Sequence, residues 1–259
     1  MASRELAAAF TDEAVARAYQ HRPPYPAQVF DILEQLIVDR PRHVLDVGAG
    51  EGAIARPLAA RVDRVDALDI SAAMLAAGAR RPGGRRPGLR WLLGAAETAE
   101  LAGPYALVTA GASLHWMTWD TTLARLSGVL TPGGVLAIVD QGYHHLPWQC
   151  ELGAIIARHS RSRDYDPGFS LPAELAARGL LQITGQARTG PVSFRQPVTH
   201  YVEQFHSTAS LARVWMPAME SAAFDRAVAQ AIAPYAVDGA LELAVTASLT
   251  WGRPVVSPC

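Results

Sequence analysis

The amino-acid sequence predicts an α/β fold, in which a doubly wound, mostly parallel β-sheet carries helices on both faces. Between about residues 40 and 141, short apolar runs alternate with helical patterns, and this alternation is typical of βαβ units. The first apolar run leads directly into a glycine-rich loop. The chain has 259 residues, half of them hydrophobic, which is enough for one large domain of this kind.

The elements up to residue 141 follow from apolar spacing and from helix-breaking residues. Two helices come first and are separated by the segment 21–24, which contains two prolines. Strands then alternate with helices, and Ser71 is placed to cap one of these helices. In chain order we expect helices 11–20 and 26–38, strand 43–47, helix 53–60, strand 62–69, a helix from Ser71, strands 89–93 and 105–110, helix 120–130, a turn at 131–134 and strand 135–140.

The pattern changes after residue 141, where helical and strand-like segments no longer alternate regularly. In chain order we expect helices 148–160 and 172–178, strand-like segments 180–187 and 191–195, a mostly helical stretch 199–236 and a final strand 241–251. No linker composition interrupts the chain, so we expect one domain over residues 1–259. Its parts are a helical segment 1–40, a core 41–141, and a second half 142–259 with a helical insertion 196–238 before the last strand.

Composition excludes several classes of protein. The formal net charge is −1 and only 18% of residues are charged, which argues against a general nucleic-acid or anionic-membrane binder. All 23 cationic residues are arginines and the chain has no asparagine, so Schiff-base and phosphate-loop lysines and a Cys-His-Asn triad are absent. Two distant cysteines form no disulfide framework, and no Cys/His cluster predicts a metal site. The amino terminus has no long apolar segment, and no stretch of about 18 apolar residues occurs, so we expect a cytoplasmic protein without a membrane span.

The segment from Val44 to Ala53 is the most informative part of the chain. Glycines directly after a buried strand permit a tight turn and let a ligand approach the backbone, and the following helix offers free N–H groups. Gly48, Gly50 and Ala53 also satisfy the dinucleotide pattern, so the glycines do not decide the ligand. Asp46 at the strand end would repel a pyrophosphate and suits a ligand with an ammonium group, such as S-adenosylmethionine. A carboxylate held by loop amides for structure alone stays an alternative.

Asp69 ends the next strand, 17 residues beyond Gly52. From this position a carboxylate can accept hydrogen bonds from both hydroxyls of a ribose. The alternative is that Asp69 only helps to cap the helix that follows.

These segments resemble the motifs of class I S-adenosylmethionine-dependent methyltransferases. Residues 46–52 look like the first motif of that family, residues 67–71 with Met74 are similar to its ribose-binding motif, and residues 130–136 resemble its turn into strand five. The resemblance implies a Rossmann-like, seven-stranded sheet and the cofactor S-adenosylmethionine, with S-adenosylhomocysteine as product. It implies that Gly48, Ala49 and Gly50 line the methionine part, that Asp69 binds the ribose, and that Ile70 and Met74 flank the adenine.

Two further matches to the family are looser. Residues 94–97 read Gly-Ala-Ala-Glu where the family often has Gly-Asp-Ala-Glu, so backbone groups of Ala95 and Ala96, with Glu97, would replace the missing adenine-contacting acid. Tyr19, Arg22 and Tyr25 resemble a helical lid found in the branch that includes trans-aconitate methyltransferase, where such residues can reach the methionine carboxylate. A simple proline-rich helix break is the alternative.

The end of strand four is where the resemblance locates the chemistry. Ala112 and Ser113 would lie beside the cofactor, and His115 has the intrinsic pKa of a general base near neutrality. A structural histidine is the alternative for His115. Trp116 would line the acceptor pocket together with aromatic residues of the second half, namely Tyr143, Phe205 and Trp215.

The sequence therefore predicts methyl transfer to a small-molecule acceptor by a monomer or homodimer. Aromatic residues favour an apolar or aromatic acceptor, and Arg195 and Arg213 are candidates to hold an acceptor carboxylate. Two alternatives stay open: a nicotinamide- or flavin-dependent oxidoreductase, and a protein that binds S-adenosylmethionine without transferring its methyl group.

Overall fold

The computed structural model describes residues 4–162 and 168–256, which group into two compact units. We call residues 25–141, 166–190 and 247–259 the strand unit, and residues 1–24, 142–165 and 191–246 the helical unit. Both contain segments that are distant in the sequence, because the chain leaves the strand unit after Gln141 and returns to it twice. The expectation of a single domain stays a prediction.

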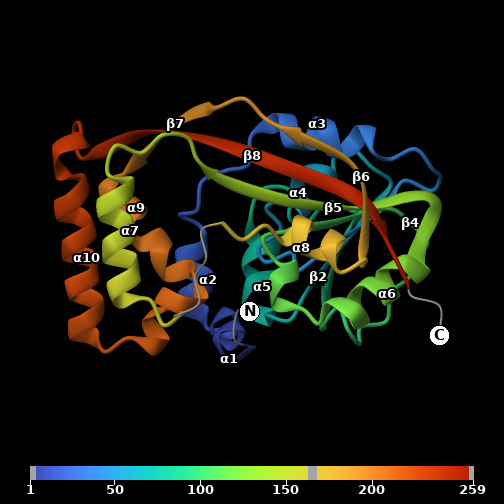
Figure 1. Ribbon diagram of the computed structural model, residues 1–259, viewed down its shortest axis with the longest axis horizontal. Helices are drawn as coiled ribbons and strands as arrows, with labels where there is room; N and C mark the ends of the chain where they lie inside the picture. The colour runs from blue at the N-terminus through green and yellow to red at the C-terminus, as the bar shows by residue number, and fades with distance from the viewer. Residues whose placement is uncertain (1–3, 163–167, 257–259) are drawn as a thin grey trace. The chain divides into compact units, whose positions relative to one another are not determined.

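The strand unit is built on a sheet with the order β3-β2-β1-β4-β5-β8-β6 (Figure 1). Strands β1 to β5 pair in parallel, and β6 pairs with β8 antiparallel. The strand bounds are β1 His43–Val47, β2 Arg64–Asp69, β3 Leu89–Leu93, β4 Tyr105–Gly111, β5 Leu130–Tyr143, β6 Leu181–Arg188 and β8 Ala240–Pro254. The predicted parallel, doubly wound α/β architecture is confirmed.

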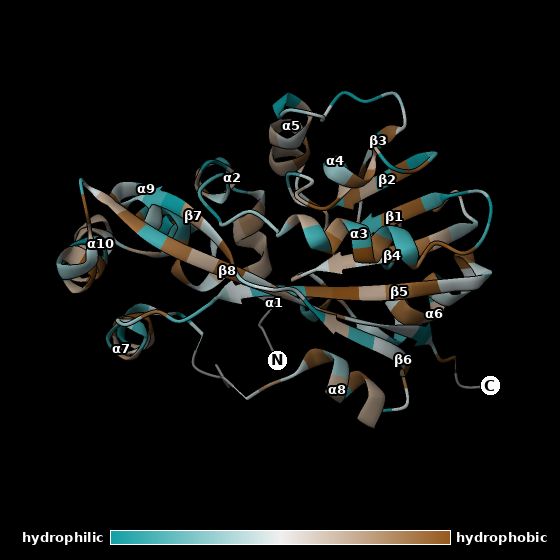
Figure 2. Ribbon diagram, turned by 90° about the horizontal axis from the view of Figure 1, so that it is seen from above, coloured by the Kyte–Doolittle hydropathy of each residue, from teal (hydrophilic) through white to brown (hydrophobic). Residues whose placement is uncertain are grey.

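Helices cover both faces of this sheet because its central strands are apolar on both sides. One core joins α3 (Ala27–Gln35) and α4 (Ala55–Leu58) to side chains such as Val44, Leu107 and Val139. The opposite core joins α6 (Trp119–Val129) and α8 (Leu171–Ala177) to residues of alternate parity such as Ile138. Figure 2 shows β4 and β5 coloured largely as hydrophobic. The remaining helix of the unit is α5 (Ala72–Arg80), which begins after Ser71, and the Ser71 hydroxyl accepts from the Met74 N–H as predicted.

The helical unit has its own apolar core, which contains Tyr201, Phe224 and Leu241. The stretch predicted as mostly helical is divided into α-helices and several short 3-10 turns. Its elements are α1 Arg4–Ala7, η1 Ala8–Thr11, α2 Glu13–Tyr19, α7 Gln149–His159, β7 Val192–Pro197, α9 Val198–Glu203, η3 Gln204–Ser207, η4 Ala209–Leu211, η5 Arg213–Trp215, α10 Ala218–Ile232 and η6 Ala233–Tyr235. Strand β7 pairs antiparallel with the first part of β8.

The structure corrects three expectations about the elements. The sheet has eight strands rather than seven, because the 15 residues of β8 are long enough to pair first with β7 and then with β6. The helix expected at 53–60 is confined to Ala55–Leu58, with turns on either side. The turn expected at 131–134 lies inside β5 as an irregularity, where the register passes from Tyr105↔Leu130 to Leu107↔Val135.

None of the helices in the described ranges combines the length and apolarity that crossing a bilayer requires.

Candidate active site

The loop between β1 and α4 has three glycines in the left-handed region, Gly48, Gly50 and Gly52, with φ of +64°, +57° and +76°. A side chain in this conformation costs about 1–2 kcal/mol. Gly48 is restricted sterically as well, because a β-carbon there would lie 2.4 Å from Cβ of Ser113. The sequence Gly48–Gly52 therefore fixes a tight loop at the carboxyl end of β1, against the end of β4.

Asp69 ties this loop to the end of β2. Its side chain is buried, and Oδ2 accepts a hydrogen bond of 2.8 Å from the backbone N–H of Gly50. The other oxygen, Oδ1, accepts one of 2.8 Å from the N–H of Ser71, and the N–H of Ile70 donates as well. Burial raises the pKa of Asp69, although these three donors oppose the shift. The carboxylate is thus held beside the glycine loop and also binds the N-cap residue of α5, so its ribose-binding role stays a prediction beside the helix-capping alternative.

Asp46 lies one residue before the end of β1 and is 2% exposed. Oδ1 accepts a hydrogen bond of 2.7 Å from the Thr109 hydroxyl on β4, and the backbone N–H of Ala55 donates to the same carboxylate. Burial raises its pKa to about 7 despite these two donors, and the charge of Asp69 adds to the shift. Asp46 therefore links β1 to Thr109 on β4 and to the first residue of α4, Ala55, which is compatible with a purely structural role. A direct contact between Asp46 and a ligand stays a prediction.

Apolar side chains lie open at the ends of β2 and β3. Ile70 is 48% exposed and Leu93 is 64% exposed, and Leu93 is the register partner of Asp69. Met74, in contrast, is 2% exposed and points into the protein. Leu93 was missed from the sequence because an apolar residue at a strand end looks like core. The signal that identifies it is Gly94, which begins the loop after β3.

The segment after β3 contacts the rest of the strand unit through side chains. Ala96 packs in the core of the strand unit, and Ala95 is half-buried. Oε1 of Glu97 accepts a hydrogen bond of 2.9 Å from the N–H of Thr118. This contact joins the loop after β3 to the start of α6.

Ala112 and Ser113 follow β4 in an unusual conformation. Ala112 has φ of +48°, and its N–H donates to the Val139 carbonyl at 3.1 Å. Ser113 is buried, and its hydroxyl donates to the Val47 carbonyl at 2.6 Å. Positive φ at a residue with a β-carbon stores strain, and such strain is common at functional sites. Ser113 thus joins the ends of β4 and β1, next to Gly48.

His115 and Trp116 lie in the one-turn η2 helix (Leu114–Trp116) that follows. Their rings are 4.8 Å apart between centroids and tilted by 45°, and both side chains are half-buried. On the opposite face, the Tyr25 hydroxyl lies close to Gly111, since a β-carbon there would be 2.9 Å from it. His115 and Trp116, expected beside the reacting groups, and Tyr25, expected near the methionine carboxylate, therefore all lie near the end of β4.

Tyr19 and Arg22 lie in the helical unit and contact one another. The Arg22 guanidinium lies 4.2 Å from the Tyr19 ring centroid and donates to the Tyr19 hydroxyl at 3.2 Å. It also donates to the hydroxyl and the carbonyl of Ser207 at 2.8 and 3.1 Å. Arg22 therefore fastens the chain after α2 to η3, and its predicted contact with a cofactor carboxylate stays untested.

The aromatic candidates in the helical unit differ in burial. The Tyr143 hydroxyl donates to Oε1 of Gln204 at 2.6 Å, and burial raises the pKa of Tyr143. Phe205 packs edge-on against Tyr201 and Phe224. Trp215 is 37% exposed. Trp215 is thus the most open of these side chains, while Phe205 belongs largely to the core.

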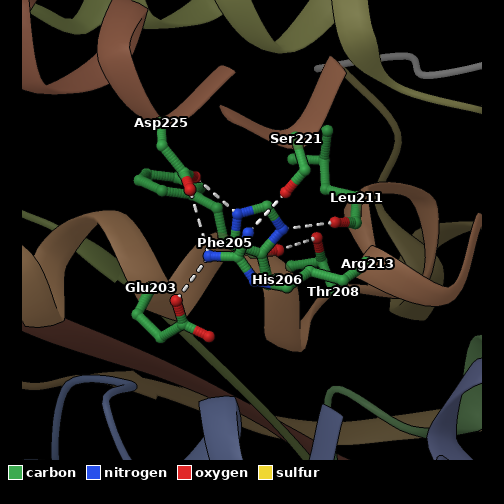
Figure 3. Close-up of polar contacts among 8 residues, drawn as sticks. All are labelled: Glu203, Phe205, His206, Thr208, Leu211, Arg213, Ser221 and Asp225. Atoms are coloured by element: carbon green, nitrogen blue, oxygen red, sulfur yellow. Dashed lines mark hydrogen bonds and ion pairs between the residues drawn. The ribbon is translucent and has the colours of Figure 1, made fainter. Parts of the chain in front are cut away.

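Arg213 is engaged in a cluster of polar side chains within the helical unit (Figure 3). Its guanidinium pairs with Glu203 at 2.6 Å and Asp225 at 3.1 Å and donates to the Ser221 hydroxyl. Next to it, the His206 nitrogens face the Leu211 carbonyl at 2.8 Å and Asp225 at 2.7 Å (Figure 3). Two carboxylates neutralise Arg213, which makes it a poor anchor for an acceptor carboxylate.

Arg195, the other candidate for an acceptor carboxylate, is also engaged within the helical unit. It lies 3.5 Å from Glu242 and donates to the Val237 carbonyl at 3.2 Å. Within the described residues, no group of three or more His, Cys, Asp or Glu side chains is arranged to hold a metal ion.

Comparison with known proteins finds similarity to methyltransferases. Residues 44–134 match a family model described as a methyltransferase domain. An uncharacterized methyltransferase of Mycobacterium tuberculosis is 45% identical over 100 residues, which cover 37% of this chain and 49% of that protein. A trans-aconitate 2-methyltransferase of Methylobacterium radiotolerans is 32% identical over 165 residues, covering 57% of this chain and 62% of that protein. The chain thus spans about half the length of the first of these relatives.

Two solved structures share the fold. One is a protein assigned as a type II methyltransferase from Anaeromyxobacter dehalogenans, with a TM-score of 0.62 and 24% identity over 90% of this chain and 97% of that one. The other is a SAM-dependent methyltransferase from Geobacter sulfurreducens in complex with S-adenosyl-L-homocysteine, with a TM-score of 0.54 and 16% identity over 90% and 92%. At these identities the structures establish the fold alone. The family-model match falls on residues 44–134, which form β1 to β4 and the start of β5 of the parallel sheet.

Proposed function

We propose that this protein transfers a methyl group from S-adenosylmethionine to a small-molecule acceptor. The observation that carries the proposal is the left-handed glycine loop whose Gly50 N–H is bound by the buried Asp69 at the end of the neighbouring strand. In an open parallel sheet, ligands bind outside the carboxyl ends of the strands. Loop and carboxylate occupy that edge at β1 and β2.

The residues at this edge fit the parts of S-adenosylmethionine. Gly48, Ala49 and Gly50 offer backbone that a methionine moiety can approach closely, and Asp69 offers carboxylate oxygens to ribose hydroxyls. Ile70 and Leu93 offer open apolar surface to the flat adenine ring. When bound, S-adenosylmethionine supplies a methyl group on a positively charged sulfur, a good leaving group. Two acids beside the loop favour such a cationic ligand.

The remaining predicted contacts belong to this proposal. On the cofactor side they are Tyr19, Arg22, Tyr25, Asp46, Met74, Ala95, Ala96, Glu97, Ala112 and Ser113. On the acceptor side His115 would remove a proton from the acceptor where its nucleophile carries one. Trp116, Tyr143, Phe205 and Trp215 would contact the acceptor body. Proximity and orientation supply much of the rate of such a displacement. Hydrogen bonds of Ala112 and Ser113 fix the backbone at the end of β4, which supports a role of this segment in orienting the reactants.

An oxidoreductase with a dinucleotide cofactor is less well supported. Dinucleotide sites bind the pyrophosphate at the start of a helix, where the dipole and free N–H groups favour an anion. Here α4 has only four residues, and both Asp46 and Asp69 hold this loop. A pyrophosphate would meet Asp69 and a helix of a single turn rather than a strong helix terminus.

Calorimetry and labelled methyl transfer test the proposal together. S-adenosylmethionine and S-adenosylhomocysteine should bind the purified protein, whereas NAD and FAD should not. Transfer of labelled methyl from S-adenosylmethionine to a fractionated metabolite extract should then be observed. Binding without transfer in any fraction would favour a non-transferring binder, and binding of NAD or FAD instead would contradict the proposal.

Location and partners complete the proposal. The balanced charge of the chain supports a small molecule rather than a nucleic acid as acceptor. A cytoplasmic location and a monomeric or homodimeric state stay predictions. Size-exclusion chromatography with light scattering measures the second directly.

A further inference from the structure

Strand β5 extends beyond the end of its neighbour β4. Strand β4 ends at Gly111, whose register partner is Val139, whereas β5 runs on to Tyr143. Asp140 is therefore the first residue of β5 past the end of β4. It lies beside Ala112, whose N–H is bound by the carbonyl of Val139. This position is at the carboxyl edge of the sheet, within the strand unit.

The alternation of side chains along β5 gives the face on which Asp140 lies. Val139 belongs to the core with α3 and α4. Ile138 belongs to the opposite core, which also contains Leu114 of η2. Asp140 has the parity of Ile138 and so lies on the same face as η2. His115 and Trp116 belong to that same turn of helix.

Asp140 differs from the other acids at the centre of this sheet in having no protein partner. Asp46, Asp66 and Asp69 each accept hydrogen bonds from nearby donors. Over residues 4–162 and 168–256, no hydrogen bond or ion pair engages the Asp140 side chain. Asp140 is exposed, although partial desolvation by the surrounding protein raises the pKa of its carboxyl. A carboxyl that solvent reaches and protein surrounds is suited to a ligand that brings its own donor.

We propose that Asp140 binds a protonated amine on the methyl acceptor, beside the turn that carries His115. This inference rests on the proposed function, because it assigns one contact of its acceptor. Asp140 would accept a charge-assisted hydrogen bond and hold the amine-bearing acceptor over the ends of β4 and β5.

The distribution of charge at this edge favours a cationic over an anionic acceptor. Asp46 and Asp69 place two further acidic side chains at the carboxyl ends of β1 and β2, although burial raises the pKa of both. Glu51 in the glycine loop already pairs with Arg56 at 3.9 Å and with Arg81 at 3.0 Å. A polycarboxylate would meet unpaired negative charge at Asp140. The acceptor class therefore differs from the tricarboxylate named for the Methylobacterium radiotolerans relative.

Three matched probes test the assignment: benzylamine, benzyl alcohol and benzoate, which carry a cation, a neutral hydroxyl and an anion on the same ring. Their binding to protein saturated with S-adenosylhomocysteine is measured by ligand-observed NMR titration. Wild-type protein should bind benzylamine at least tenfold more tightly than benzoate. Asp140→Asn keeps the shape of the side chain and removes its charge, so it should abolish this preference, a change of about 10- to 100-fold.

The matched control is Glu100→Gln, which removes one exposed carboxylate from the loop after β3. It should leave the preference for benzylamine unchanged. Both variants should bind S-adenosylhomocysteine within twofold of wild type, which also shows that they fold. If S-adenosylhomocysteine fails to bind wild-type protein, the proposed function falls and this inference with it. If it binds but benzylamine shows no preference, or keeps its preference in Asp140→Asn, the inference alone is overturned.

Discussion

The contact between Gly48 and Ser113 yields a prediction whose size follows from the structure. A β-carbon on Gly48 would lie 2.4 Å from Cβ and 3.0 Å from Oγ of Ser113, and 3.4 Å from the methyl group of Met117. Gly48→Ala therefore combines left-handed strain of about 1–2 kcal/mol with overpacking of about 1–3 kcal/mol. We expect the free energy of unfolding to fall by about 2–5 kcal/mol and the affinity for S-adenosylmethionine to fall at least tenfold.

A second substitution separates these two contributions. Ser113→Gly removes both close atoms, so Gly48→Ala in that background should retain only the left-handed strain. Ser113→Gly alone loses the hydrogen bond to the Val47 carbonyl, at a cost of about 1 kcal/mol. The double variant should thus be more stable than the sum of the two single effects by about 1–3 kcal/mol.

The measurement is urea unfolding followed by tryptophan fluorescence, with calorimetry for the affinity. Gly128→Ala in α6 is the control, because a β-carbon there meets no atom within 4 Å. That change should leave stability equal or raise it by about 0.5–1 kcal/mol. Additive effects of Gly48→Ala and Ser113→Gly, within about 0.5 kcal/mol, would show that the loop relaxes freely and would refute the steric argument.

Four further outcomes follow from the site. Asp69→Ala should weaken S-adenosylmethionine binding about 10- to 150-fold in calorimetry, the equivalent of a hydrogen bond to a charged group, and unchanged affinity would remove its ribose role. His115→Ala should lower turnover about 10²–10⁴-fold with cofactor affinity preserved, and a loss below about threefold would leave only a structural role. Burial raises the pKa of Asp46 from 3.8 to about 7, so the folded state holds this proton more tightly than the unfolded state does. The free energy of unfolding should therefore fall by about 1.4 kcal/mol per pH unit as the pH rises between these two values. Unfolding curves of Asp46→Asn should lack this slope. Trp215→Ala should alter acceptor kinetics with cofactor affinity within about twofold, and loss of dimerisation alone would assign Trp215 to an interface.

Local patterns in the sequence were sufficient to predict the succession of strands along the chain and the position of the glycine loop. Strand β1 and the loop after it are encoded within ten consecutive residues, and Asp69 follows at the end of the next strand. Both are short-range features, in which apolar runs and glycines specify the backbone directly. The eighth strand was not predictable in the same way, because β8 serves two partners that lie more than 40 residues away in the sequence.

Contacts over long sequence distances determined which acids have partners. Thr109 lies 63 residues from Asp46, and no local pattern indicates that its hydroxyl would satisfy that carboxylate. Asp140 looked like the ordinary end of an apolar strand, and only the register with β4 shows that it projects past its neighbour. The sequence therefore predicted correctly that Asp46 and Asp69 lie at the carboxyl ends of their strands. Which acidic side chains at this edge have protein partners could be learned only from the structure.

The same reasoning explains why cationic residues of the helical unit resembled ligand anchors in the sequence. Between Gln204 and Trp215 the chain forms only single 3-10 turns, which satisfy few of their own backbone groups. His206 binds the Leu211 carbonyl and Asp225 of α10, and Arg213 joins Glu203 to Asp225. These side chains thus replace the hydrogen bonds that a longer helix would supply and attach the segment to α10. Because Glu203 and Asp225 already face Arg213, an acceptor with a negative charge gains little from this arginine.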